Sequence, residues 1–202
     1  MTTPRFCVLW YVPNVIGYIR LALLLAAWLT FDMPLLFIPL YTLSILLDGV
    51  DGWAARKLQQ VSAFGAWLDV AVDCIGRSLL WCCLYKWGFF IACLEWLVFV
   101  CTHNMGPVWR SIEAPWWVEG VMAKGFKTPV GMFAIAGLHV LPLWLYGHET
   151  GVQLYTWHLP HTIHYTAVLL LAAGRMLCVP VELWFVWNHV QFLISEKPGP
   201  TT

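Results

Sequence analysis

Six long apolar stretches constrain what this chain can fold into more than any other feature. A helix needs about 20 residues to cross a hydrocarbon core of about 30 Å, and each stretch is at or near that length. Only 11% of the residues are charged and 60% are hydrophobic, a balance typical of membrane proteins. The sequence therefore predicts an all-α polytopic membrane protein, one domain over residues 1–202, with six transmembrane helices. The stretches lie near residues 13–31, 35–56, 65–87, 88–108, 128–146 and 163–190.

Two boundaries follow from local composition. The third and fourth stretches run together through "KWGFFIACLEW", so we expect a tight turn on the luminal side at Lys86 to Gly88. The polar end "EKPGPTT" predicts a disordered tail from about residue 196 to 202.

Basic residues near the ends of the stretches predict the orientation. Cytoplasmic loops of membrane proteins carry an excess of Lys and Arg. With both termini cytosolic, Lys86 is the only Lys or Arg near the end of a stretch that faces the lumen. The basic residues on the cytosolic side are then Arg5, Arg56, Lys57, Arg110, Lys124, Lys127 and Lys197.

The formal net charge of the chain is zero, which gives no reason to expect a nucleic-acid partner.

Four aspartates interrupt the second and third apolar stretches, within "LLDGVDGWAARKLQQVSAFGAWLDVAVD" at residues 46–73. A carboxylate at the bilayer centre costs about 2.5–3.5 kcal/mol, so four of them require compensation, which a bound cation would supply. Asp48 and Asp51 are three residues apart, and Asp69 and Asp73 are four apart, so each pair shares a helix face. A lone intramembrane aspartate could equally be a satisfied core residue, but two such pairs favour a metal site.

The short connection from Lys57 to Phe64 predicts that the two acidic helices pack antiparallel around a polar, cytosol-facing cavity. Carboxylate oxygens without Cys or His suit a hard ion, Mg²⁺ or Mn²⁺, which commonly also binds substrate phosphates. Gly52 and Gly65 lack side chains near this cavity and leave room for a ligand. Arg56 adds a fixed cation for a phosphate.

The same residues resemble the signature of the CDP-alcohol phosphotransferases, and every specified position is filled. Within that family the chain is most similar to the eukaryotic phosphatidylinositol synthases, through "VPNVIGYIR" at 12–20, "LLDGVDGWAAR" at 46–56 and "FGAWLD" at 64–69. The signature, about an eighth of the chain, is specific because it fixes eight residues at set spacings. In order these are Asp48, Asp51, Gly52, Ala55, Arg56, Gly65, Asp69 and Asp73.

The resemblance implies an enzyme that transfers a phosphatidyl group from CDP-diacylglycerol to an alcohol such as myo-inositol, with release of CMP. It implies that Asp73 is the general base and that all four aspartates bind Mg²⁺ or Mn²⁺. It also implies membrane lipids as surroundings, an endoplasmic reticulum location and a homodimer. The residues that would bind the metal and the CDP group are Asp48, Asp51, Gly52, Ala55, Arg56, Gly65 and Asp69.

Three arginines within the apolar stretches are candidates for contact with the acceptor or a phosphate: Arg20, Arg77 and Arg175. Arg20 could instead extend to the interface. After Asp73 the chain reads "CIGRSLL", where phosphatidylinositol synthases carry an arginine immediately after the last aspartate, and Arg77 could substitute for it. Arg175 shares a face with Glu182, seven residues on, and the two could form a purely structural pair.

Three alternatives remain open at this point. The chain could use a different acceptor alcohol, because of the departure after Asp73. It could bind CDP-lipid without turnover, although no aspartate of the signature is missing. It could transport a divalent metal, but a transporter needs polar groups across the whole membrane, and the luminal halves of these stretches are almost wholly apolar.

Overall fold

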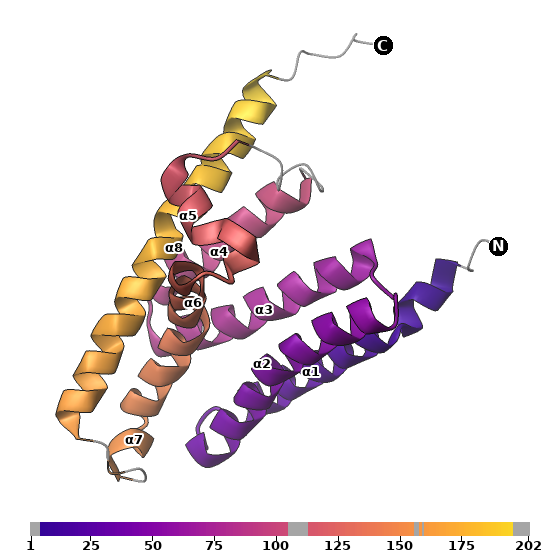
Figure 1. The fold of residues 1–202 in the computed structure, drawn as a ribbon. Helices are drawn as coiled ribbons and strands as arrows, with labels where there is room; N and C mark the ends of the chain where they lie inside the picture. The colour runs from indigo at the N-terminus through magenta and orange to yellow at the C-terminus, as the bar shows by residue number, and fades with distance from the viewer. Residues whose placement is uncertain (1–4, 105–112, 156–157, 159, 196–202) are drawn as a thin grey trace. The chain divides into compact units, whose positions relative to one another are not determined.

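The computed structural model describes residues 5–104, 113–155, 158 and 160–195. Every regular element among these residues is helical, and none of them lies in a strand (Figure 1). The predicted all-α class is therefore confirmed for this part of the chain. The expected disordered tail at 196–202, which contains Lys197, lies outside the described residues, as does Arg110.

Each predicted apolar stretch coincides with one long helix. Four of the long helices, α1, α2, α6 and α8, are long and apolar enough to cross a membrane. Helix α3 carries Asp69, Asp73 and Arg77, and α4 is a shorter apolar helix of 17 residues. Six crossings therefore stay a prediction. The elements are η1 (Arg5–Trp10), α1 (Val12–Leu29), α2 (Pro34–Lys57), α3 (Ala63–Leu84), α4 (Gly88–Asn104), α5 (Trp116–Phe126), α6 (Pro129–Glu149), α7 (Val152–Tyr155) and α8 (His161–Ser195).

The turn between α3 and α4 lies where the sequence predicted it. The backbone N–H of Tyr85 donates to the carbonyl of Trp81 at 3.1 Å, and that of Gly88 donates to Tyr85 at 2.9 Å. A Cβ at Gly88 would overlap the carbonyl of Trp81, so the turn requires glycine there. The tight turn at Lys86 to Gly88 is confirmed, whereas its luminal location stays a prediction.

The described contacts divide the chain into two compact units. Unit 1 comprises residues 1–89 and 146–158, and in it α1 packs against both α2 and α3 (Figure 1). The α1–α3 contact is close at Gly17, where a Cβ would lie 2.8 Å from Leu68 Cδ2. In the same unit the Tyr146 hydroxyl donates to the carbonyl of Phe31 at 2.5 Å. The close approach at Gly17 brings α1 and α3 together, and the Tyr146 hydrogen bond ties the end of α6 to the connection between α1 and α2.

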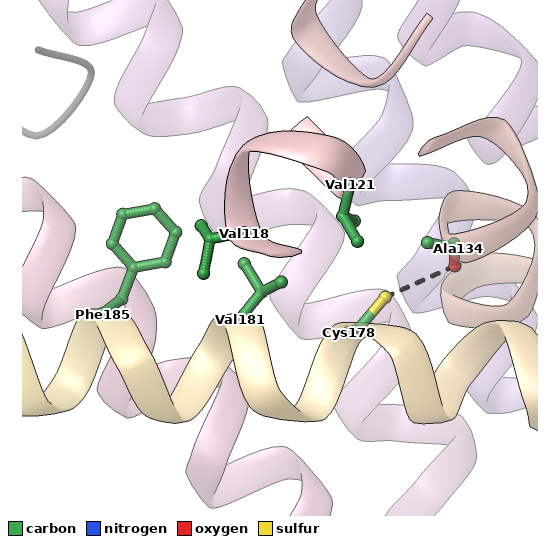
Figure 2. Close-up of a cluster of buried hydrophobic side chains, with 6 residues drawn as sticks. All are labelled: Val118, Val121, Ala134, Cys178, Val181 and Phe185. Carbon is green, nitrogen blue, oxygen red and sulfur yellow. Dashed lines mark hydrogen bonds between the residues drawn. The ribbon is translucent and has the colours of Figure 1, made fainter. Parts of the chain in front are cut away.

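Unit 2 comprises residues 90–145 and 159–202. Figure 2 shows its apolar core, in which side chains of α5 and α8 pack with Ala134 of α6. The Cys178 thiol donates to the carbonyl of Ala134 at 3.4 Å. A Cβ on Gly137 of α6 would overlap the α8 backbone at Gly174 and Arg175, so the two helices are in backbone contact. The core residues are Val118, Val121, Ala134, Cys178, Val181 and Phe185.

Candidate functional site

In unit 1, the guanidinium of Arg20 lies between the four aspartates and bridges the two acidic helices twice. Its Nη1 is 2.7 Å from Asp51 Oδ2 of α2 and 2.7 Å from Asp69 Oδ1 of α3. Its Nη2 is 2.9 Å from Asp48 Oδ1 of α2 and 2.6 Å from Asp73 Oδ1 of α3. Each terminal nitrogen therefore joins one carboxylate from each helix. The predicted convergence of the two acidic faces is confirmed.

The arginine is the most buried side chain of the cluster, and two of the aspartates around it are largely open to solvent. The Arg20 side chain is only 1% exposed, and that of Asp51 is 8% exposed. By contrast Asp48 and Asp69 are 41% and 44% exposed. A buried guanidinium is stable only when it is paired, and the open carboxylates leave the cluster accessible from one side. Arg20 thus lies inside the acidic site rather than extending to an interface.

Helix α1 has a larger part in this arrangement than the sequence indicated. The sequence predicted that α2 and α3 pack antiparallel, and in the structure α1 packs on each of them more extensively than they pack on each other. The hydroxyl of Ser44 on α2 donates to the carbonyl of Arg20 at 3.2 Å, which ties the two helices at the level of the acids. Four like charges repel, so the acidic helices need a cation between them, and α1 supplies it.

Arg77 lies next to the last aspartate of the signature, as the spacing suggested. Its Nη1 is 3.4 Å from Asp73 Oδ2, one helical turn away on α3. Asp73 therefore has an arginine on each carboxylate oxygen: Arg20 on Oδ1 and Arg77 on Oδ2. The residue directly after Asp73 is Cys74, so the arginine of α3 that lies beside this carboxylate is four residues further along the helix.

The donor chemistry of the cluster fits a hard divalent cation. One oxygen from each of Asp48, Asp51 and Asp69 can be chosen so that all three lie within 4.8 Å of one another. With every group ionised, four carboxylates against the guanidiniums of Arg20 and Arg77 leave two negative charges, which one divalent ion would balance. Asp73 is not in this group of three, so its predicted part in metal binding stays a prediction.

A cavity of about 300 Å³ opens beside the cluster, with Asp51 and Asp69 in its wall. The wall also contains the four non-acidic residues of the set predicted to bind the metal and the CDP group. The structure therefore brings these residues together with two of the acids. They are Gly52, Ala55, Arg56 and Gly65.

Three further polar residues of the cavity wall were missed from the sequence: Asn14, Gln60 and Ser62. Gln60 Oε1 accepts from the backbone N–H of Val12 at 2.9 Å and so ties the α2–α3 connection to the start of α1. Ser62 is the N-cap of α3, and its hydroxyl accepts from the N–H of Gly65 at 3.0 Å. Serine before an apolar helix is a recognisable cap signal, but nothing local indicates that Asn14 faces a cavity.

Arg175 belongs to a separate buried charge cluster in unit 2. Its Nη1 is 3.0 Å from Glu182 Oε2, which confirms the pair suspected along α8. Its Nη2 is 3.6 Å from Glu95 Oε1 of α4, a partner that we did not predict. The three side chains are 3–10% exposed. A contact between Arg175 and an acceptor stays a prediction.

Comparison with known proteins agrees with this geometry. The family model for CDP-alcohol phosphatidyltransferase matches residues 10–194. The chain is 45% identical over 71 residues to the probable CDP-diacylglycerol–inositol 3-phosphatidyltransferase 2 of Arabidopsis thaliana, which covers 35% of this chain and 32% of that protein. The CDP-diacylglycerol–inositol 3-phosphatidyltransferase of Saccharomyces cerevisiae is 45% identical over 78 residues, which are 38% of this chain and 36% of that protein. The human enzyme of the same name is 44% identical over 64 residues, which are 31% of this chain and 30% of that protein.

The chain thus spans about a third of the length of the curated relatives it matches. No solved structure matches the chain significantly. The family model, in contrast, extends over residues of both compact units and includes every signature position. The chain therefore belongs to the CDP-alcohol phosphatidyltransferase family.

Proposed function

We propose that the protein transfers a phosphatidyl group from CDP-diacylglycerol to a hydroxyl of myo-inositol and releases CMP. One observation carries the proposal: four carboxylates from two helices meet at one buried arginine, beside a cavity of about 300 Å³ lined by the signature residues. The relatives named above are inositol phosphatidyltransferases, which supports inositol as the acceptor.

In the proposed reaction the acceptor oxygen attacks the phosphorus that carries diacylglycerol. The bond from that phosphorus to the bridging diphosphate oxygen breaks, and CMP leaves with the bonding electrons. The proton of the attacking hydroxyl passes to a carboxylate oxygen of Asp73. Asp73 suits this role because its side chain is 24% exposed and because it lies outside the group of three carboxylates that best fits a cation.

Asp48, Asp51 and Asp69 would hold a divalent ion, on which the family depends in general; we propose Mg²⁺ or Mn²⁺. Such an ion, when bound, neutralises charge on the diphosphate and aligns the attacking and leaving oxygens. Arg20 keeps the carboxylates of α2 and α3 at a fixed separation. The exposed side chain of Arg56 in the cavity wall can pair with a phosphate of the donor.

We further propose that α3 and α4 cross the membrane with the other four long helices, that both termini are cytosolic and that the cavity opens to the cytosolic leaflet. Such a cavity would receive the CDP headgroup while the acyl chains stay in the bilayer. An endoplasmic reticulum location and a homodimer belong to the same proposal.

The test is CMP release by the purified chain from CDP-diacylglycerol with Mg²⁺ or Mn²⁺. The acceptor panel contains inositol, serine, glycerol phosphate, choline and ethanolamine. We expect release with inositol, none without a divalent ion, and a loss of at least 100-fold for Asp73→Asn, since general-base catalysis contributes about 10²–10⁴-fold. Asp32→Asn, which changes an aspartate between α1 and α2, is the matched control and should keep its activity.

Each alternative predicts a different result in that assay. Release with another alcohol but not inositol would assign a different acceptor. Binding of CMP with no release for any acceptor would indicate a non-catalytic homologue. Full activity of Asp73→Asn would exclude Asp73 as the base. Metal uptake into vesicles without CMP chemistry would indicate a transporter.

A further inference from the structure

Arg20 makes its closest contact with each carboxylate of the candidate metal site through one oxygen. Its Nη1 lies 2.7 Å from Asp51 Oδ2 and 2.7 Å from Asp69 Oδ1, and its Nη2 lies 2.9 Å from Asp48 Oδ1. A carboxylate has two oxygens with about four lone-pair positions, so each of the three can pair with the guanidinium and still bind an ion. Arg20 and a divalent ion can therefore share the same three carboxylates.

The burial of the cluster separates the two cations. The Arg20 side chain is 1% exposed, whereas those of Asp48 and Asp69 are 41% and 44% exposed. An ion that arrives from solvent therefore reaches the open carboxylates before it reaches the buried guanidinium. Arg20 lies at the base of the ion site, and it does not have to leave when an ion binds.

The planar guanidinium also fixes the spacing of the two acidic helices at this site. Each terminal nitrogen joins one carboxylate of α2 to one of α3, and both nitrogens belong to one rigid group. Nε of Arg20 is buried and has no hydrogen-bond partner among the described residues, so the group is oriented through its two terminal nitrogens. The Ser44 hydroxyl of α2 holds the Arg20 carbonyl at 3.2 Å. The carboxylates are thus tied to a group that does not stretch.

Charge and spacing act differently on a bound ion. The positive charge of Arg20 repels any divalent ion on the same carboxylates, so it weakens the binding of all such ions alike. Spacing depends on ion size, because Mg²⁺ binds oxygens at about 2.0–2.1 Å, whereas Ca²⁺ binds them at about 2.3–2.6 Å and takes more ligands. A site whose carboxylates cannot move apart therefore holds the smaller ion better than the larger one.

We propose that Arg20 determines which divalent ion the acidic site accepts: its charge lowers the affinity for every such ion, and its rigid planar group restricts the site to ions of the size of Mg²⁺ and disfavours Ca²⁺. This inference rests on the proposed function, in which Asp48, Asp51 and Asp69 hold the ion. Arg20 is a positioning residue, since it acts on the ion through these carboxylates.

The test is ion binding to the full chain in detergent without substrate. The paramagnetic resonance signal of free Mn²⁺ reports its binding, and Mg²⁺ and Ca²⁺ are added as competitors. Wild type should bind Mg²⁺ at least about tenfold more tightly than Ca²⁺. Arg20→Met removes the charge and the planar group, so it should bind Mn²⁺ at least about tenfold more tightly and lose the preference for Mg²⁺. Arg20→Lys keeps the charge on a flexible stem, so it should keep the Mn²⁺ affinity within about threefold and still lose that preference.

Arg77→Met is the matched control. It removes a second buried arginine, whose carboxylate contact is with Asp73 and not with the group of three, so it should keep the preference for Mg²⁺. Arg20→Lys decides the question where Arg20→Met does not fold. An unchanged Mg²⁺ preference in either Arg20 variant, or a wild type that binds Ca²⁺ as tightly as Mg²⁺, would overturn the inference and leave the proposed function intact. A wild type that binds no divalent ion would overturn the proposed ion site as well.

Discussion

Replacing Arg20 with methionine tests whether one guanidinium holds the acidic helices together. Methionine keeps the length and apolar stem of the side chain but removes four charge contacts of 2.6–2.9 Å. Two unit charges 4 Å apart attract by about 4 kcal/mol at an effective dielectric constant of about 20, and the desolvation of Arg20 offsets much of the sum. The variant also leaves the carboxylates to repel one another.

The net effect on stability can be bounded. Removing one partner of a buried ion pair costs about 3–5 kcal/mol. Water screens part of the attraction, because Asp48 and Asp69 are 41% and 44% exposed, so we take the lower end, about 3 kcal/mol. For a chain of 202 residues this lowers the melting temperature by about 6–12 °C.

The measurement is thermal unfolding in detergent micelles, followed by the fluorescence of the 14 tryptophans, once with a chelator and once with Mn²⁺. We expect the 6–12 °C loss in chelator and a larger stabilisation by Mn²⁺ in Arg20→Met than in wild type, because the variant keeps every carboxylate and lacks their internal cation. Arg56→Met is the control: it removes an exposed arginine, and its melting temperature should equal that of wild type. A melting temperature for Arg20→Met within about 2 °C of wild type in chelator would refute the reasoning.

Three further predictions concern other parts of the chain. Gly137→Ala forces a methyl group into the α8 backbone and should cost about 1–3 kcal/mol in the free energy of unfolding; an unchanged melting temperature would contradict the backbone contact. Arg175→Met leaves Glu182 buried without its cation and should cost about 3–5 kcal/mol in the same measurement, and a loss under 1 kcal/mol would show that the pair is dispensable. Burial and the hydrogen bond to Glu149 raise the pKa of Tyr85 to about 12, so this bond stabilises the fold below pH 10 and is lost as the pH rises through about 12. Glu149→Gln should lower that pKa toward its ordinary value near 10 in a phenolate absorbance titration, and no change would exclude Glu149 as a cause.

The features that could be predicted from the sequence are those fixed by local periodicity. Apolar length places the long helices, and the i,i+3 and i,i+4 spacings put Asp48 with Asp51 and Asp69 with Asp73 on shared faces, whatever the rest of the chain does. The short α2–α3 connection then brings the two faces near each other. These inferences needed no knowledge of how a third helix is rotated.

The features that could not be predicted depend on that rotation. From the sequence, Arg20 could extend to the interface or turn toward the acids, and only the packing of α1 decides between the two. Glu95 is a single acid in an apolar helix, and its pairing with Arg175 depends on how α4 meets α8. Asn14 looks like an ordinary residue of a first helical turn, and its unpaired acceptor becomes visible only with the cavity wall in place.

Helix α1 contributes the buried cation of the acidic cluster and part of the cavity wall. Asn14, Gly17 and Arg20 follow at intervals of three residues and are all buried, so Gly17 is a neighbour of both on the buried side of the helix. Gly17 lies in the middle, where its missing side chain lets Leu68 of α3 approach. That approach places Asp69, the next residue of α3, within 2.7 Å of Arg20, and Gly65, one helical turn earlier, in front of Asn14. The α1–α3 distance at Gly17 therefore sets both the charge pairing of the acids and the opening to the Asn14 acceptor, so the two cannot vary independently.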